Sequence, residues 1–276
     1  MASFTPQLIP NAYFNGVRSY TYNDVTTFYD WDDNSCFGVN GFEQHVSGGV
    51  TIASGIGILY SSVIPITNSE SVSYTLSGIM QYTDASVNGK VTIRELDEDL
   101  STLSDTTWQP ALTDSLAGYE YTIGGAVTND LQLNSNTISL QILLNQTTQE
   151  YRIYSLELVG STYTLGNTDL SLPASYEENL LQRSSYTAGG KALSDDSYSS
   201  PLKQLSMDYV ISQKTDYDTM YSFLNSNDIK YTLGTFNYTD ALGNTFFGKF
   251  LQDNTNIMGT QYYGASLNLT FMELPY

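Results

Sequence analysis

The chain has 276 residues, 41% hydrophobic and only 14% charged, which is enough to bury one large core or two ordinary ones beneath a surface of neutral polar side chains. The 29 acidic residues outnumber the 10 basic ones, for a formal net charge of -19. A surface of that sign repels nucleic acid phosphates and anionic membranes, so we expect neither sequence-specific nucleic acid binding nor membrane insertion. The 23 tyrosines and 11 phenylalanines favour β-strands, because flat rings pack well on pleated surfaces.

Cysteine use and the start of the chain narrow the class further. Cys36 is the single cysteine, so no internal disulfide forms and stability is expected from packing or assembly. Residues 1–5 lack the basic and apolar stretches of a secretory signal, and no apolar run approaches a membrane-spanning length. We therefore expect a soluble chain that is made in the cytoplasm. No cofactor is expected.

The first half of the chain shows the patterns of short β-strands. Val72–Leu76 and Lys90–Arg94 alternate apolar and polar side chains across a polar connection, which predicts a hairpin. Ile138–Leu144 alternates in the same way, and Tyr151–Leu158 follows a polar turn as its predicted partner. Short strands with regular turn signals are typical of an antiparallel sandwich.

The composition changes near Gly160. Residues 160–200 are rich in Ser, Thr, Gly, Asn and Asp, which predicts a polar linker or extended arm between an N-terminal domain, 1–159, and a C-terminal domain, 201–276. Beyond the arm, Leu205–Ile211 alternates as a strand with one buried face.

One helix is predicted, over residues 215–225. Acidic residues occupy its first turn, where the helix dipole favours negative charge. Its apolar side chains recur at i, i+3, i+4 and i+7, and we expect this face to pack and to contribute assembly contacts: Tyr217, Met220, Tyr221 and Leu224. Three further strand patterns follow: Phe236–Tyr238, Phe246–Phe250 after a turn at Asp240–Asn244, and Ala265–Phe271.

Catalytic chemistry has little support in this sequence. His45 is the only histidine, so a Ser-His-Asp triad or a multi-histidine zinc site has to be built around it, and a loop histidine is the favoured interpretation. Glu95 and the acidic run Asp97–Asp99 supply carboxylates for glycoside hydrolysis only if two of them converge, whereas neighbouring residues at a strand end alternate in direction. We expect no catalytic residues and no enzyme.

Two further sets of residues are candidates for binding. Asp30, Asp32 and Asp33 form a weak candidate calcium cluster, but they lack the spacing and closing Glu of a calcium loop, so a solvated acidic turn is favoured and no metal site is expected. Trp31 and Trp108 could stack on the apolar face of a sugar. Packing in the core or at its rim is the alternative for both indoles.

Residues 1–159 resemble jelly-roll carbohydrate-binding modules. The resemblance rests on the opening Leu8–Gly16, which precedes the strand with Trp31, on Val72–Ser77 as a central strand and on Tyr151–Leu158 as the closing one. It implies a jelly-roll β-sandwich and the binding of a glycan.

Residues 165–276 are similar to the β-sandwich with one helix in tail proteins of tailed bacteriophages. The similarity rests on Leu205–Ile211, the helix Asp216–Leu224, the hairpin Phe236–Phe246 and the closing strand Ser266–Leu274. Such domains form rings, so the similarity implies a virion component of the tail or baseplate.

Together these patterns predict a mainly β protein, with an N-terminal jelly-roll β-sandwich and a C-terminal β-sandwich bearing one short α-helix. The expected role is structural: a homo-oligomeric ring in the virion, contacting other virion proteins and presenting the jelly roll to neighbours or to a host surface glycan. The alternatives are a carbohydrate-binding module of a bacterial surface protein and a β-sandwich hydrolase.

Overall fold

The structure, a computed structural model, divides the chain into two compact units. The sandwich unit is Pro6–Ser161, and the helix unit joins Met1–Thr5 to Thr162–Pro275. The residues that the structure describes are 2–9, 12–14, 17–20, 25–28, 31–33, 42–44, 48–83, 87–126, 129–166, 168–170, 175–179, 183–186, 192–195, 202–211, 213–226, 229, 234–240, 243–250, 258–259 and 265–273.

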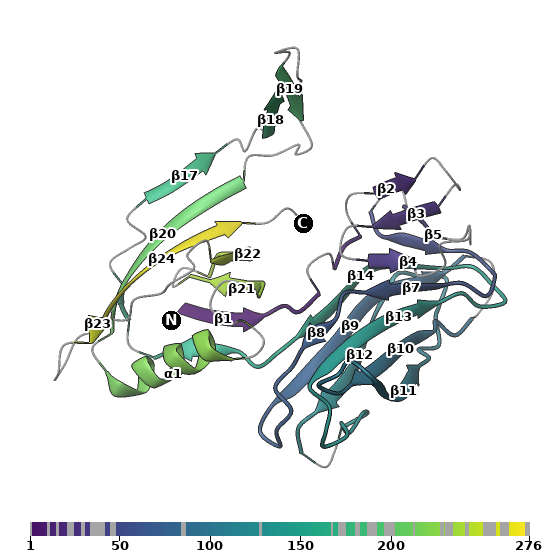
Figure 1. Ribbon diagram of the computed structural model, residues 1–276, viewed down its shortest axis with the longest axis horizontal. Helices are drawn as coiled ribbons and strands as arrows, with labels where there is room; N and C mark the ends of the chain where they lie inside the picture. Colours follow the sequence, from purple (N-terminus) through teal and green to yellow (C-terminus); the bar gives the residue numbers. More distant parts are fainter. Residues whose placement is uncertain are drawn as a thin grey trace. The chain divides into compact units, whose positions relative to one another are not determined.

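Two antiparallel sheets make up the sandwich unit (Figure 1). The larger sheet has eight strands, in the order β11 (Thr102–Trp108), β10 (Val91–Leu96), β13 (Ser139–Asn145), β7 (Ile58–Ser61), β4 (Trp31–Asp33), β3 (Val25–Phe28) and β2 (Val17–Tyr20), with β8 (Ile64–Pro65) also beside β13. The five-stranded sheet has the order β12 (Ala117–Gly124), β9 (Ser73–Tyr82), β14 (Tyr151–Val159), β6 (Val50–Ile52) and β5 (Phe42–Gln44).

The connectivity of these strands is that of a jelly roll. From β6 to β14 the chain passes repeatedly between the sheets, so that β6, β9, β12 and β14 lie in the smaller sheet and β7, β10, β11 and β13 in the larger one. Two interlocked Greek keys of this kind define a double-sheet jelly roll. The predicted jelly-roll sandwich is confirmed.

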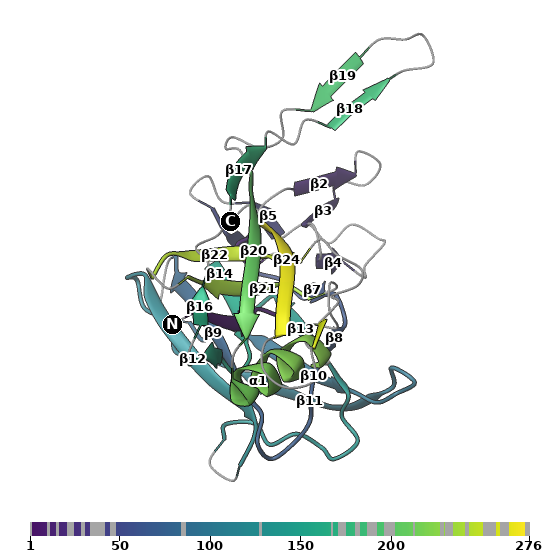
Figure 2. The ribbon, with the colours of Figure 1, turned by 90° about the vertical axis from the view of Figure 1, so that its left-hand side faces the viewer.

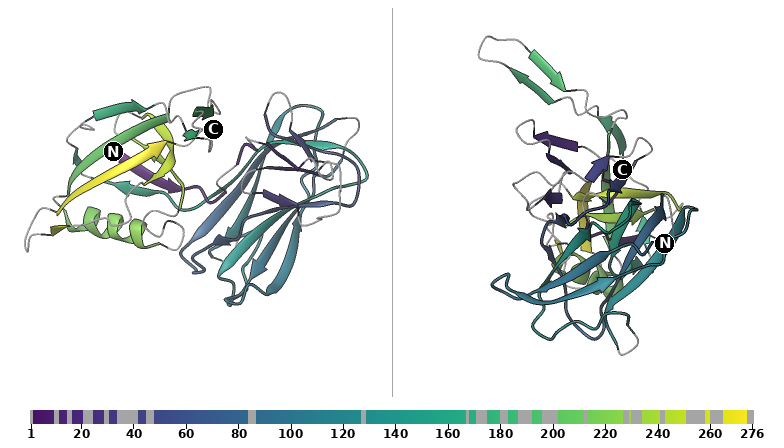
Figure 3. Two further views of the ribbon diagram at one scale, coloured as in Figure 1. Left: turned by 45° about the horizontal axis from the view of Figure 1, so that its top comes forward. Right: turned by 90° about the vertical axis from the view of Figure 1, so that its right-hand side faces the viewer.

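The two sheets enclose a mostly aliphatic core, and Figure 3 shows the two layers. Tyr74, Leu76 and Met80 face it from β9, while Val91 and Ile93 face it from β10. Alternate residues of each strand therefore point into the core and the others point outward, as the pleat requires.

Both predicted hairpins in this unit are wrong, although the strands themselves are present. β9 pairs with β12 and β14, whereas β10 pairs with β11 and β13. The members of each expected pair, β9 with β10 and β13 with β14, thus lie in opposite sheets. The physical reason is that alternation specifies which face of a strand is buried, and strands on either side of one core share that pattern.

A nine-stranded sheet and one helix build the helix unit (Figure 2). The sheet order is β15 (Tyr163–Leu165), β1 (Ala2–Pro6), β21 (Phe236–Thr239), β22 (Thr245–Phe250), β24 (Ala265–Glu273), β20 (Leu202–Ile211) and β16 (Thr168–Leu170), with β17 (Ser175–Asn179) beside β20 and β23 (Met258–Gly259) beside β24. β18 (Arg183–Tyr186) and β19 (Ala192–Asp195) form a separate two-stranded sheet.

The helix α1, Lys214–Asn225, confirms the predicted helix to within one residue. Its buried apolar side chains are Met220, Phe223 and Leu224. They pack into a core of aromatic rings, in which Phe236 lies 5.2 Å from Phe223 between ring centroids. Within the described part of the chain, no helix has the length and apolarity needed to cross a membrane.

The domain boundaries differ from those expected at residues 159 and 200. Ala2 pairs with Leu165, and Phe4 is buried in the aromatic core, so the first strand belongs to the helix unit. β15, β16 and β17 lie within the stretch expected as a linker, 160–200, and extend the nine-stranded sheet. The polar composition of these segments gives no strand signal. Their pairing partners are also distant in sequence, so no local pattern predicts them.

Candidate functional site

The two tryptophans proposed for sugar binding are core residues. Trp31 is 1% exposed and its ring lies 5.0 Å from that of Phe14, while Trp108 is 7% exposed and lies 5.7 Å from Tyr121. A sugar stacks on an indole only if one ring face is open to solvent. The sugar-binding assignment of Trp31 and Trp108 is therefore corrected in favour of the packing alternative.

The candidate calcium cluster finds no support in the described residues. Asp30 lies outside them, and so does His45. Asp32 and Asp33 are consecutive in β4, opposite Tyr60 and Leu59 of β7. No group of three or more His, Cys, Asp or Glu that could hold a metal ion occurs in the described part of the chain.

The predicted assembly face of the helix is mostly internal. Met220 and Leu224 are buried in the helix unit's own core, together with Phe223, which the sequence pattern missed. Tyr221 is 50% exposed and stacks on Tyr217, with 6.1 Å between ring centroids. Only the two tyrosines remain available to a neighbouring molecule, which corrects the assignment of Met220 and Leu224.

Glu95 is a structural anchor. Its side chain is only 2% exposed. Its Oε1 accepts a hydrogen bond from Ser104 Oγ at 2.5 Å, and its Oε2 accepts from Thr137 Oγ1 at 2.6 Å and from the backbone N–H of Asn134 at 2.7 Å. A buried carboxylate with three donors ties the turn before β13 to β10 and β11. Asp97 stabilises its own turn, where its Oδ1 accepts hydrogen bonds from the backbone N–H groups of Asp99 and Ser101.

A set of outward-facing side chains on four adjacent strands forms the best candidate site. We call it the polar face: Tyr60 on β7, Thr92 and Arg94 on β10, Asp105 and Thr107 on β11, and Gln141 and Asn145 on β13. The strand pairing aligns Asp105 with Arg94 and Arg94 with Gln141, and it aligns Thr107 with Thr92 one row away. Directly opposed residues share a face, so these side chains stand together outside the core.

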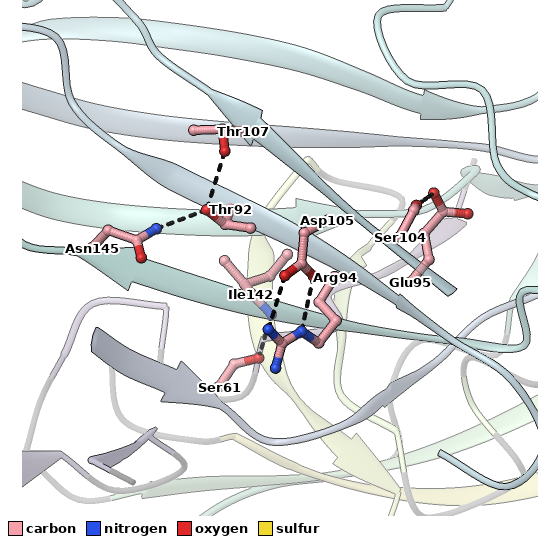
Figure 4. A network of polar contacts seen from close by, with 9 residues as sticks. All are labelled: Ser61, Thr92, Arg94, Glu95, Ser104, Asp105, Thr107, Ile142 and Asn145. Atoms are coloured by element: carbon pink, nitrogen blue, oxygen red, sulfur yellow. Dashed lines mark hydrogen bonds and ion pairs between the residues drawn. The ribbon is translucent and has the colours of Figure 1, made fainter. Parts of the chain in front are cut away.

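Arg94 and Asp105 form a two-point ion pair on this face (Figure 4). Arg94 Nε donates to Asp105 Oδ1 at 2.8 Å and Nη2 donates to Oδ2 at 2.9 Å. The hydrogen bonds and charge of Arg94 lower the pKa of the Asp105 carboxyl below its ordinary value. The same pairing raises the pKa of Arg94, so both groups stay charged and the guanidinium plane is fixed.

A second chain of hydrogen bonds runs beside this pair. Asn145 Nδ2 donates to Thr92 Oγ1 at 2.7 Å, and the hydroxyls of Thr92 and Thr107 lie 3.4 Å apart (Figure 4). Gln141 Nε2 donates to the backbone carbonyl of Ser61 at 3.0 Å. The side chains are thus held in place by their neighbours.

The face retains hydrogen-bonding capacity. Arg94 Nη1, Gln141 Oε1, Asn145 Oδ1 and the Tyr60 hydroxyl have no hydrogen-bond partner among the described residues. These atoms include donors and acceptors beside an aromatic ring. Such an arrangement suits a neutral ligand that is rich in hydroxyl groups.

Sequence reasoning missed this face, although the signal was present. Thr92 and Arg94 alternate with the apolar Val91 and Ile93, and Gln141 lies between the apolar Leu140 and Ile142. The polar positions of each strand were therefore readable. Their placement on one common face could not be predicted, because it depends on β10 and β13 being neighbours in one sheet.

Comparisons with known proteins identify similar structures only at low sequence identity. No protein family matches the sequence, and no curated protein is significantly similar to it. A CBM4 carbohydrate-binding module matches with a TM-score of 0.37 and 14% identity over 55% of this chain and 99% of the module. An arabinose-bound GH51 α-L-arabinofuranosidase matches with a TM-score of 0.35 and 13% identity, over 56% of this chain and 26% of that enzyme.

Another similar structure is the enzymatically active domain of tailspike protein 4 from bacteriophage CBA120, with a TM-score of 0.31 and 12% identity. The match covers 56% of this chain and 19% of the tailspike chain. The chain therefore spans only about a quarter or less of the enzymes it matches.

Proposed function

We propose that the sandwich unit is a non-catalytic saccharide-binding module and that the polar face is its binding surface. The observation that supports this most directly is the set of side chains on β10, β11 and β13 that are already oriented by hydrogen bonds and keep unused donors and acceptors. Jelly rolls are also a common architecture of lectin domains.

Physical chemistry favours a neutral saccharide as the ligand of this surface. Sugar hydroxyls both donate and accept, so they match the mixed set left by Arg94, Gln141 and Asn145. Since neighbouring groups already hold these side chains, little conformational entropy is lost on binding. The Tyr60 ring supplies a flat apolar contact beside them.

The test is a screen of the full chain on an array of neutral oligosaccharides, followed by calorimetric titration with the best ligand. Gln141→Ala and Tyr60→Ala should each weaken binding about fivefold to tenfold, since each removes about one hydrogen bond or ring contact. Thr75→Ala, an exposed position on β9 in the other sheet, is the matched control. Absence of binding on the array, or unchanged affinity in both variants, would contradict the proposal.

We further propose that the chain acts as part of a multi-copy virion assembly, and the β18–β19 hairpin is the observation that favours this. In the described part of the chain these two strands pair only with each other. A lone two-stranded hairpin is marginally stable in water, and contact with another subunit would stabilise it. It lies within residues 160–200, the stretch expected to form an arm.

Light scattering and mass spectrometry test this second role. Purified particles should contain the chain, and replacement of residues 183–195 by a short Gly-Ser segment should lower the oligomer mass in solution. Detection of the chain on a bacterial surface, in the absence of particles, would instead favour the bacterial surface module.

A further inference from the structure

Arg152 is an unusual cation on the outer face of the five-stranded sheet. Its Nε is buried and has no hydrogen-bond partner. No hydrogen bond or ion pair of its terminal nitrogens is present among the described residues either, whereas Arg94 in the other sheet is paired with Asp105. The chain has a net charge of -19, so carboxylates are plentiful. A guanidinium that pairs with none of them therefore needs an explanation.

The neighbours of Arg152 form one polar row across four strands. Arg152 on β14 is directly opposite Gln81 on β9 and Thr51 on β6, and Thr51 is directly opposite Glu43 on β5. Residues opposite one another share a face, and adjacent strands lie about 4.8 Å apart, so the row is roughly 14 Å long. Glu43 lies two strands away from Arg152 and is not its ion-pair partner.

An exposed apolar side chain adjoins this row. Ile79 on β9 is 41% exposed, and it points outward two residues before Gln81. Its neighbour on β12 is Gly118, where an added Cβ would meet no atom within 4 Å. The open space above Gly118 leaves one side of the Ile79 side chain accessible next to the polar row.

We propose that this outer face is a second binding surface and that it takes a saccharide carrying a single carboxylate, such as a terminal uronic or sialic acid. Arg152 binds the carboxylate through its terminal nitrogens, which present two donors in one plane. Thr51 and Gln81 hydrogen-bond the adjacent hydroxyls, and Ile79 contacts the apolar face of the ring.

The charge of the protein restricts the ligand further. A densely charged polyanion would be repelled by the acidic surface and by Glu43 in the same row. A lone carboxylate on an otherwise neutral saccharide avoids most of that repulsion, because salt screens charges that are more than about 8 Å apart at physiological ionic strength. Glu43 then accepts hydrogen bonds from hydroxyls at the far end of the row.

The surface is independent of the polar face, which lies on the other sheet. Its test is titration of the full chain with matched oligosaccharides that end in glucuronic acid, galacturonic acid, N-acetylneuraminic acid or glucose. At least one acid-terminated probe should bind tenfold or more tightly than the glucose-terminated one. Arg152→Gln should abolish that preference, and Arg152→Lys should keep part of it, because the charge remains but the planar pair of donors is lost.

Two controls separate this surface from the polar face and from misfolding. Gln141→Ala should weaken the glucose-terminated probe without abolishing the binding of the acid-terminated one, and Arg152→Gln should melt at or above the temperature of the unaltered protein, since it removes a buried donor without a partner. Ile79→Ser should weaken the acid-terminated probe and leave the glucose-terminated probe, which binds the polar face, unchanged.

Binding of acidic probes with no binding of neutral ones would contradict the proposed role of the polar face and would support this second surface. An acid preference that survives Arg152→Gln, or equal affinity for all four probes, would overturn the inference. Tighter binding of a glutamate-containing peptide through Arg152 would assign the surface to a protein partner instead.

Discussion

The two units bury their cores in different ways. Leu, Ile and Val side chains from both sheets fill the sandwich unit, and buried polar groups such as Glu95 and Gln146 anchor its loops. The helix unit relies on rings in mutual contact: Phe236 alone lies within 6 Å, between ring centroids, of Phe4, Phe223, Phe250 and Phe271. Stability in the sandwich unit is therefore distributed, whereas in the helix unit it is concentrated in a few side chains.

The largest effect should come from removing the central ring of the helix unit. Phe236→Ala should destabilise that unit by about 3–5 kcal/mol, because it deletes a fully buried ring and leaves a cavity among several others. Hydrogen exchange should show lost protection in β21, β22 and α1. Tyr221→Ala, at an exposed helix position, is the control and should change little.

Exchange protection that falls equally in β9, β10 and β13 would mean that the two cores unfold as one. The two units would then not differ in how their stability is distributed among side chains.

The sandwich unit should also be sensitive at a polar anchor. Glu95→Ala should cost about 2–3 kcal/mol, since it leaves the buried donors of Thr137 and Asn134 without their acceptor. Glu95→Gln keeps an acceptor of the same size and should cost less. Denaturant unfolding of the two variants measures the difference, and equal stability of both would show that the carboxylate is not the anchor.

Tyr151 gives the sandwich unit a distinct dependence on pH. Its ring is fully buried and its hydroxyl donates to the Asn145 carbonyl at 2.8 Å, and burial raises the pKa of this phenol well above that of an ordinary tyrosine. A raised pKa in the folded state means that the contribution to stability is complete below about pH 10 and is lost as pH rises further. We expect alkaline unfolding of the sandwich unit.

Tyr151→Phe tests this dependence. It should cost about 1 kcal/mol at pH 7 through the lost hydrogen bond, and it should flatten the decline in stability above pH 10. Melting curves between pH 7 and 11 provide the measurement. An unchanged alkaline slope would assign the decline to other tyrosines.

The smallest effect belongs to the ion pair of the polar face. Asp105→Asn should cost less than about 1 kcal/mol, because both partners are partly exposed and solvent screens the pair. The pKa of Asp105 is lowered in the folded state, so this contribution is present above about pH 4 and is lost as pH falls. Thermal melts at pH 7 and pH 3 should show a smaller deficit of the variant at pH 3 than at pH 7.

Local patterns predicted the elements of this fold well. The strands over Ile138–Leu144 and Leu205–Ile211 and the helix near Thr215 were readable because each depends on the periodicity of its own residues. Burial of Trp31 was less readable, since a strand of three residues carries almost no periodic signal.

Pairing between distant strands escaped prediction. β1 pairs with β15 through Ala2 and Leu165, and no local pattern links positions so far apart. The polar face and the row around Arg152 were missed for the same reason: each is made by residues of separate strands that only the sheet order brings together.

The placement of β1 makes the sandwich unit an insertion within the helix unit. The chain lays down one strand of the helix unit, then the complete jelly roll, and only then the remaining strands and α1. On the ribosome, the jelly roll can therefore fold before Phe4 meets its partners Phe236 and Tyr238, which are synthesised more than two hundred residues later. The helix unit should be the slow and late step of folding, because closing so long a loop must precede its core.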